Sequence, residues 1–251
     1  MTRALFATLA VGLLFAGGCM KMHTETTIGP DGSGTAMVHF SMAQEVADAV
    51  QELSEMPDNQ MGQTPPSLAD ISKEEIEEAA AKYGVKVKRF DKITADGRNG
   101  IEMELAYKQL SDLSHVLGGL MGDDDEGLGL FRTEDGNYLL ATTELDLPEE
   151  ETESEDAMAT DASEMDPEAM QKSMAIMQQL MAHMNELDIS MKITVPGDVI
   201  ESNAPQVDGR TSIWKVDATN MMQVEGEMEP KIKFSGKGVD IDAPLYTDAN
   251  D

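Results

Sequence analysis

Apolar and polar residues alternate along several stretches of the chain, and Asp-Gly pairs separate these stretches. The clearest stretch is residues 101–107, where every second side chain is large and apolar. Such alternation is typical of a strand with one buried face, and Asp-Gly favours the tight turns that match strand twist. Four such pairs predict four hairpin turns: Asp31-Gly32, Asp96-Gly97, Asp135-Gly136 and Asp208-Gly209.

The same pattern gives the bounds of most strands. We expect three hairpins, from Met22–Ile28 to Thr35–Phe40, from Val85–Ile93 to Ile101–Tyr107, and from Gly129–Thr133 to Tyr138–Leu145. A final group of strands is expected at Ile189–Val195, Thr211–Asp217 and Lys231–Ser235.

Helical segments follow the hairpins. Capping-box patterns predict helices that begin near Ser41 and near Ser72. The expected helices are Met42–Glu55, a segment from Ser72 to a stop at Gly84, Asp112–Leu120 capped by Ser111, and Pro167–Leu187 capped by Asp166. The sequence therefore predicts an α+β fold, in which an antiparallel sheet built from hairpins carries helices packed on one face.

The N-terminal residues predict export and lipid attachment. Arg3 is the only charge in residues 1–18, and the apolar run Ala4–Ala16 is too short to span a membrane as a helix, which needs about 20 residues. The run ends in small residues before the single cysteine, Cys19. This motif resembles the lipobox of bacterial lipoproteins, in which the cysteine is acylated and becomes the new N-terminus. We expect residues 1–18 to be a lipoprotein signal peptide and Cys19 to be the lipid attachment site.

Acidic residues dominate the middle of the chain. Residues 120–170 carry 18 acidic side chains and a single basic one, Arg132. Residues 148–166 have almost no aliphatic content, so this segment cannot bury enough apolar area to offset the entropy lost on ordering. We predict an acidic disordered insertion at 148–166, within a single α+β domain formed by residues 19–147 and 167–251.

The acidic residues do not form a calcium loop. Asp123, Asp125 and Glu134 have the spacing of EF-hand positions 1, 3 and 12, but Gly127 occupies position 5, where a ligand is needed, and Leu128 replaces the required glycine. Diffuse, low-affinity binding of divalent cations by these carboxylates stays open.

Methionines line one face of the last predicted helix, with spacings of 4, 3, 4 and 3 residues. These candidate ligand-binding residues are Met170, Met174, Met177, Met181 and Met184. Packing against the sheet would explain them, and so would a surface that adapts to variable apolar ligands, because methionine is long and flexible. Copper(I) is a third interpretation, since thioethers bind it, but Met181 and His183 point apart on a helix and cannot share one ion.

Composition and motifs narrow the function classes. The net charge of −30 argues against nucleic acid as a partner, because phosphate contacts need Lys and Arg. No H-E-x-x-H, G-x-S-x-G or P-loop motif occurs, and the four histidines lie in different elements, each without a nearby Ser or Cys constellation. We expect no enzymatic activity, no cofactor and no metal site.

The C-terminal third of the chain resembles a known family. A strand at Met191–Val195 ends in Pro196-Gly197, Ser202-Asn203 follows, and the next strand has a central Trp214. This pattern, together with a cysteine that precedes a strand, a turn, a second strand and a helix, is similar to LppM-type bacterial lipoprotein domains. The resemblance implies a lipid-anchored α+β domain and lipid or glycolipid binding, and it carries over no catalytic residues.

These observations lead to a hypothesis with two alternatives. We expect an extracytoplasmic lipoprotein of the bacterial cell envelope, held in the membrane by its N-terminal acyl chains. We expect it to bind a lipid, another amphiphile or an envelope protein. Met20 stands where lipoproteins retained in an inner membrane often carry Asp, which indicates the outer membrane if the cell has two. The alternatives are a passive structural or assembly lipoprotein and a periplasmic Cu(I)-binding protein.

Overall fold

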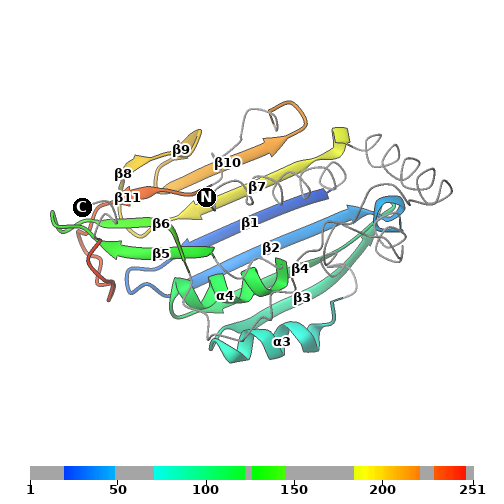
Figure 1. Ribbon diagram of the computed structural model, residues 1–251, viewed down its shortest axis with the longest axis horizontal. Coiled ribbons are helices and arrows are strands. Elements are labelled where there is room, and N and C mark those ends of the chain that lie inside the picture. Colours follow the sequence, from blue (N-terminus) through cyan, green and yellow to red (C-terminus); the bar gives the residue numbers. More distant parts are fainter. Residues whose placement is uncertain (1–19, 49–70, 122–125, 145–183, 221–228, 247–251) are drawn as a thin grey trace, which may run out of the picture.

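The computed structural model describes residues 20–48, 71–121, 126–144, 184–220 and 229–246. These residues form two β-sheets and two helices longer than two turns (Figure 1). Both sheets and both helices contribute to one hydrophobic core. In the described part of the chain, no helix is long and apolar enough to cross a membrane.

The larger sheet has seven strands, and Asp-Gly turns connect three of its neighbouring pairs. Its strands, in spatial order, are β3 (Lys86–Ala95), β4 (Arg98–Tyr107), β2 (Gly34–Ala43), β1 (Met20–Ile28), β7 (Asp188–Thr194), β10 (Thr211–Asp217) and β9 (Gln206–Asp208). The three pairs are β1–β2, β3–β4 and β9–β10. The glycine of each predicted turn has a positive φ, from 60° at Gly209 to 84° at Gly32. The predicted hairpins β1–β2 and β3–β4 are confirmed.

One strand pair of this sheet is parallel, so the prediction of an antiparallel sheet is wrong at this point. β1 and β7 run side by side in the same direction, from the pair Lys21 and Asp188 to the pair Thr27 and Thr194. Asp-Gly turns determine only the pairing of strands that follow each other directly. The pairing of β7 with β1, which ends 160 residues earlier in the chain, depends on tertiary contacts that no turn specifies.

The second sheet has four strands and is antiparallel throughout. Its order is β5 (Glu126–Arg132), β6 (Tyr138–Glu144), β11 (Ile232–Phe234) and β8 (Val199–Ser202). The third predicted hairpin is therefore confirmed, as is the predicted strand near residues 231–235. Leu140, Ile232 and Phe234 are fully buried and belong to the same apolar cluster as the larger sheet, which places the two sheets around one core.

The prediction of the helix near Ser72 is confirmed, whereas two predicted helix starts are wrong. α3 (Lys73–Lys82) begins with the expected capping box of Ser72 and Glu75. Ser41 caps no helix, because β2 continues through Ala43 and its backbone pairs with β1 and β4 instead; helical residues begin at 44. α4 (Leu110–Met121) begins before Ser111, since the buried side chain of Leu110 joins the core.

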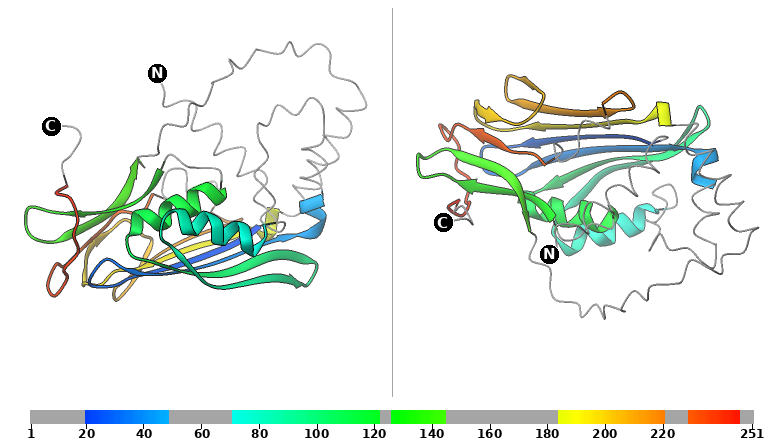
Figure 2. Two further views of the ribbon diagram at one scale, coloured as in Figure 1. Left: turned by 90° about the horizontal axis from the view of Figure 1, so that it is seen from below. Right: turned by 45° about the horizontal axis from the view of Figure 1, so that its top comes forward.

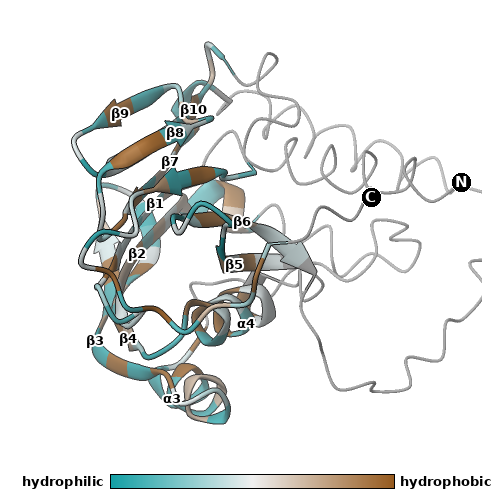
Figure 3. Ribbon diagram, turned by 90° about the vertical axis from the view of Figure 1, so that its left-hand side faces the viewer, coloured by the Kyte–Doolittle hydropathy of each residue, from teal (hydrophilic) through white to brown (hydrophobic). Residues whose placement is uncertain are grey.

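The helices pack together beside the larger sheet. α3 contacts β3 and α4, and α4 also contacts β4 and β5. Figures 2 and 3 show both helices on the same side of the seven-stranded sheet. The helix predicted over residues 167–187 lies outside the described residues except for a 3₁₀ turn, η2 (Met184–Glu186), that leads into β7.

The sheet face toward the helices is the apolar one. Because side chains alternate between faces along each strand, the register assigns the even-numbered residues of β1 and β2 and the odd-numbered residues of β4 and β7 to this inner face. Its largest buried side chains are Phe40, Ile101, Met103, Leu105, Ile193 and Trp214. The opposite, outer face carries mainly polar and charged side chains.

Candidate functional site

Most of the residues that the sequence singled out lie outside the described residues. Cys19 directly precedes Met20, the first residue of β1. Met170, Met174, Met177 and Met181 precede the described segment that begins at residue 184. Met184 opens η2, but its side chain is not among those described. The acidic insertion at 148–166 and residues 1–18 also lie outside, so these predictions stay predictions.

The structure contains a cavity of about 590 Å³ at the end of the larger sheet that is distal to Cys19. The start of α4, the β5–β6 hairpin, the turn after β1 and the C-terminal segment (residues 240–246) line this cavity, which is open to solvent on one side. Apolar side chains of Leu110, Leu130, Phe131, Ile241 and Pro244 contribute to its lining, together with polar side chains of Asp31, Lys108, Gln109, Ser111, His115, Thr143 and Asp242.

The C-terminal segment forms one wall of this cavity and is held at both ends. The amide of Asp240 donates to the Pro30 carbonyl at 2.7 Å, which fixes the segment to the β1–β2 turn. Farther on, the Arg132 amide donates to the Pro244 carbonyl at 2.7 Å and the Tyr246 amide to the Arg132 carbonyl at 2.8 Å. Backbone hydrogen bonds therefore keep this wall in place without any regular secondary structure.

A glycine at one position lets two side chains that line the cavity approach the backbone closely. A Cβ added to Gly129 of β5 would lie 2.9 Å from the ring of Phe131 and from a methyl group of Thr143, both of which line the cavity. Such distances are shorter than van der Waals contact. The absence of a side chain at Gly129 thus lets the neighbouring side chains close around the cavity.

Charged and polar groups surround the apolar part of the cavity. Lys108 and Asp242 are exposed, as is Asp31, whose pKa is lowered because its carboxylate accepts hydrogen bonds from the Ser33 hydroxyl and amide. His115 stacks on Tyr83 with ring centroids 4.7 Å apart, and its Nδ1 is buried with no hydrogen-bond partner among the described residues. A cavity with apolar walls and charges of both signs can accommodate an amphiphile.

A second group of half-buried apolar side chains lies on the inner face, at the end of the sheet next to Cys19. Met20 pairs directly with Met42 across β1 and β2, and Met22 and Met191 lie on the same face. Because β7 begins just after η2, this end of the sheet also receives the chain from the predicted methionine helix. The sequence pattern missed this group, since its members come from three separate strands.

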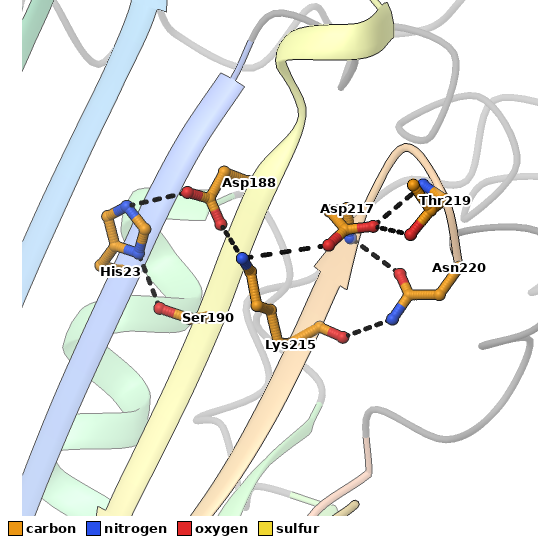
Figure 4. Close-up of polar contacts among 7 residues, drawn as sticks. All are labelled: His23, Asp188, Ser190, Lys215, Asp217, Thr219 and Asn220. Atoms are coloured by element: carbon orange, nitrogen blue, oxygen red, sulfur yellow. Dashed lines mark hydrogen bonds and ion pairs between the residues drawn. The ribbon is translucent and has the colours of Figure 1, made fainter.

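The outer face carries a polar network that spans three strands (Figure 4). Nδ1 of His23 lies 2.6 Å from Oγ of Ser190, and Nε2 of the same ring lies 3.9 Å from a carboxylate oxygen of Asp188. Lys215 on β10 contacts the carboxylates of Asp188 at 3.5 Å and Asp217 at 3.9 Å. Burial lowers the pKa of His23, and the attraction of Asp188 opposes that effect.

The sequence shows no Ser or Cys constellation near any histidine, but the fold brings one serine to His23. Residues 167 apart in the chain meet here because β1 and β7 are neighbours. In Ser-His-Asp hydrolases the serine bonds to Nε2 and the carboxylate hydrogen-bonds to Nδ1–H. Here Ser190 contacts Nδ1, and Asp188 is too distant from Nε2 for a hydrogen bond. The group thus differs from a hydrolase triad in both contacts.

His39 on β2 stands directly opposite His23. The two ring centroids are 5.8 Å apart, and Nδ1 of His39 lies 3.6 Å from a carboxylate oxygen of Glu102 on β4. Among the described residues, no three His, Cys, Asp or Glu side chains converge as metal ligands would.

Comparison with known proteins gives one family. No curated protein matches the chain. An NMR structure of the folded domain of LppM from Mycobacterium tuberculosis is similar at 16% sequence identity and a TM-score of 0.40, with 93% of this chain and 94% of that domain covered. The family model for the LppM domain matches residues 21–229. As its sequence pattern predicted, this chain belongs to the LppM domain family, and with it to the bacterial lipoproteins associated with the cell envelope.

Proposed function

We propose that this protein is a non-enzymatic lipoprotein, anchored in the membrane through acyl chains on Cys19, that binds an amphiphile in the cavity beside α4. The observation that carries the proposal is the combination of apolar walls and a charged rim in a cavity of about 590 Å³. Ligand sites are typically concave and largely apolar, with a few polar groups that orient the ligand. A lipid has both kinds of surface.

The position of Cys19 supports direct attachment of the domain to the membrane. Because β1 begins at Met20, a single peptide of about 3.5 Å separates the acylated residue from the sheet. Two or three acyl chains would suffice for stable anchoring without a basic surface. A strongly acidic mature domain therefore needs no electrostatic attraction to the bilayer.

The cavity lies far from this anchor. β1 has nine residues and ends one turn before Asp31 and Gly32, which line the cavity. At about 3.3 Å per residue, the anchored end and the cavity are separated by about 30 Å. We infer that the cavity receives its ligand from the envelope space rather than from the surface of the bilayer that holds the protein.

Met170, Met174, Met177, Met181 and Met184 remain part of the proposal as an adaptable apolar surface. They precede β7 in the chain, and Met20, Met22, Met42 and Met191 already line the sheet where β7 begins. Flexible thioethers from both groups would pack together or accept acyl chains of variable length.

Native mass spectrometry of the protein extracted from its own host tests amphiphile binding. We expect a co-purified lipid on the wild-type protein, its loss in Ser111→Trp, where the indole fills the cavity, and its retention in Glu78→Trp, an exposed position of α3. No lipid on the wild-type protein would contradict the proposal and favour a structural role. Equal lipid on both variants would exclude the cavity.

A further inference from the structure

The backbone edge of β5 passes through the cavity beside α4. Side chains alternate between the faces of a strand, so Gly129 and Phe131 belong to one face of β5 and Leu130 to the other, and all three residues line the cavity. β6 pairs with one edge of β5, and no strand of the described sheets pairs with the other edge. The backbone groups along this open edge can therefore contact a ligand wherever no other segment covers them.

Two residues on this edge are covered, and the residue between them is not. In an antiparallel pair, alternate residues direct both their N–H and their C=O away from the partner strand. Leu128 and Arg132 are such residues, because the Leu128 amide donates to the Ser114 hydroxyl of α4 at 2.9 Å and the C-terminal segment bonds both backbone groups of Arg132. Leu130 lies midway between them in the same register, so its N–H and C=O also point to the open edge. Among the described residues, neither group has a hydrogen-bond partner.

Pro244 explains why the C-terminal segment does not cover Leu130 as well. This segment runs parallel to β5 where Leu245 forms a bridge with Arg132. If the parallel pairing continued by one step toward Leu130, residue 244 would donate its amide to the Leu130 carbonyl. Proline has no N–H. The pairing therefore stops at the position where the cavity begins, since Pro244 and Leu130 both line it.

We propose that the N–H and C=O of Leu130 bind a hydroxyl group of the ligand, so that the cavity selects amphiphiles with a free hydroxyl next to the acyl chain, such as monoacylglycerols. This inference rests on the proposed binding of an amphiphile in the cavity. Ser114 shows the required geometry two residues along the same edge. Its hydroxyl accepts from the Leu128 amide at 2.9 Å and lies 3.4 Å from the carbonyl of the same residue and 3.2 Å from that of Leu110. A ligand hydroxyl at Leu130 would repeat the contact with both backbone groups.

A hydroxyl suits this position better than the other polar groups of lipids, because it both accepts and donates a hydrogen bond. An ester carbonyl or a phosphate oxygen can accept from the Leu130 amide but leaves the Leu130 carbonyl without a donor, which costs affinity once a ligand excludes water. A peptide that adds a strand needs several consecutive pairing positions, whereas Ser114 and the C-terminal segment leave only Leu130 open. The apolar side chains of Leu110 and Phe131 also line the cavity and can contact the acyl chain.

Two lipids that differ only in their hydroxyl groups provide the first test. Monooleoylglycerol has free hydroxyls, and its dimethyl ether has the same chain and ester but none. In direct competition on the full chain, measured by native mass spectrometry, we expect monooleoylglycerol to bind about tenfold more tightly, which corresponds to one net hydrogen bond. Equal affinities would overturn the assignment of the hydroxyl and leave amphiphile binding intact. Binding of neither lipid would contradict both proposals.

Leu130→Pro and Leu130→Ala separate the backbone from the side chain. Both variants lose the leucine side chain, but only proline removes the N–H, and an outward-facing position of an edge strand tolerates proline. We expect Leu130→Pro to lose most of the preference for monooleoylglycerol over its dimethyl ether and Leu130→Ala to keep it. Circular dichroism verifies that each variant folds. The same preference in both variants would contradict the role of the Leu130 amide.

The amide signals of the ¹⁵N-labelled wild-type protein give a test that needs no variant. Addition of monooleoylglycerol should shift the amide signal of Leu130 more than those of Leu128 and Arg132, whose N–H groups are already bonded within the protein. The dimethyl ether should shift the Leu130 signal less. A Leu130 signal that does not move, or that moves equally with both lipids, would overturn the proposal.

Discussion

The two faces of the seven-stranded sheet are built from the same strands but differ in what stabilises them. The inner face is almost entirely apolar, and side chains such as Trp214 and Ile101 are at most 1% exposed. On the outer face, half-exposed side chains of neighbouring strands form ion pairs and polar contacts with one another. Burial of apolar area dominates stability, whereas exposed ion pairs contribute little. We infer that the inner face fixes the fold and the outer face is free to serve binding.

Two neighbouring residues of β10, one on each face, should differ most in the stability that they contribute. Trp214→Ala removes a buried indole and should lower the free energy of unfolding by about 3–5 kcal/mol. Lys215→Ala removes two exposed ion pairs on the other face and should cost less than about 1 kcal/mol. Urea denaturation measures both. Similar losses for the two variants would contradict the division between the faces.

A close approach on the inner face gives a smaller effect. The ring of Tyr107 passes over Gly34, and its hydroxyl donates to the Thr27 carbonyl at 3.1 Å. In Gly34→Ala the new methyl group would overlap Tyr107 and the backbone of Thr27, so we expect a loss of about 1–3 kcal/mol. Thr35→Ala, at an exposed position on the outer face, should change stability by less than about 0.5 kcal/mol. The midpoints of urea denaturation of the two variants measure this difference, and equal midpoints would contradict the prediction.

An exposed ion pair should affect mainly the pH dependence of the free energy of unfolding. The Lys233 ammonium, 2.8 Å from Asp135, and the hydroxyl of Thr133 lower the pKa of the Asp135 carboxyl. The folded protein therefore binds this proton more weakly than the unfolded chain, so the stabilisation is present above about pH 4 and is lost as the pH falls below it. In Asp135→Asn, the free energy of unfolding should fall less steeply as the pH drops below about 4. In Asp208→Asn, at another Asp-Gly turn, it should fall as steeply as in the wild-type protein. An equally steep fall in Asp135→Asn would refute this role.

The smallest effect should come from the acidic insertion. If residues 148–165 are disordered, as their composition predicts, they add nothing to either face of the sheet. Their deletion should change the melting temperature by less than about 3 °C. A collapse of the fold would show that the insertion is part of the domain.

The parts of the fold that depend on neighbours in the chain could be predicted from the sequence. The four turns, the strands of β1–β2, β3–β4 and β5–β6, and the cap of α3 follow from local chemistry. The parallel pairing of β1 with β7 does not, because strand alternation carries no information about a distant partner. The start of α4 was missed for a related reason, since tertiary burial of Leu110 overrides the capping preference of Ser111.

The candidate sites were harder to predict than the fold. The cavity is assembled from five separate segments, and one wall is an irregular C-terminal stretch with no periodic pattern. His23 and His39 are individually unremarkable in the sequence and become neighbours only through the register of β1 with β2. Family membership was the exception, because a local pattern around Trp214 carried it.

Photochemical crosslinking of lipid that is supplied from solution to the acylated protein tests the central claim most directly. A phospholipid with a diazirine in its acyl chain is activated by light, and the modified peptides are identified by mass spectrometry. The account predicts adducts in residues 108–115, 129–131 and 241–244, about 30 Å from Cys19 along β1. Adducts confined to other segments, such as the predicted methionine helix at 167–187, or no adducts on the domain, would contradict an amphiphile site in this cavity.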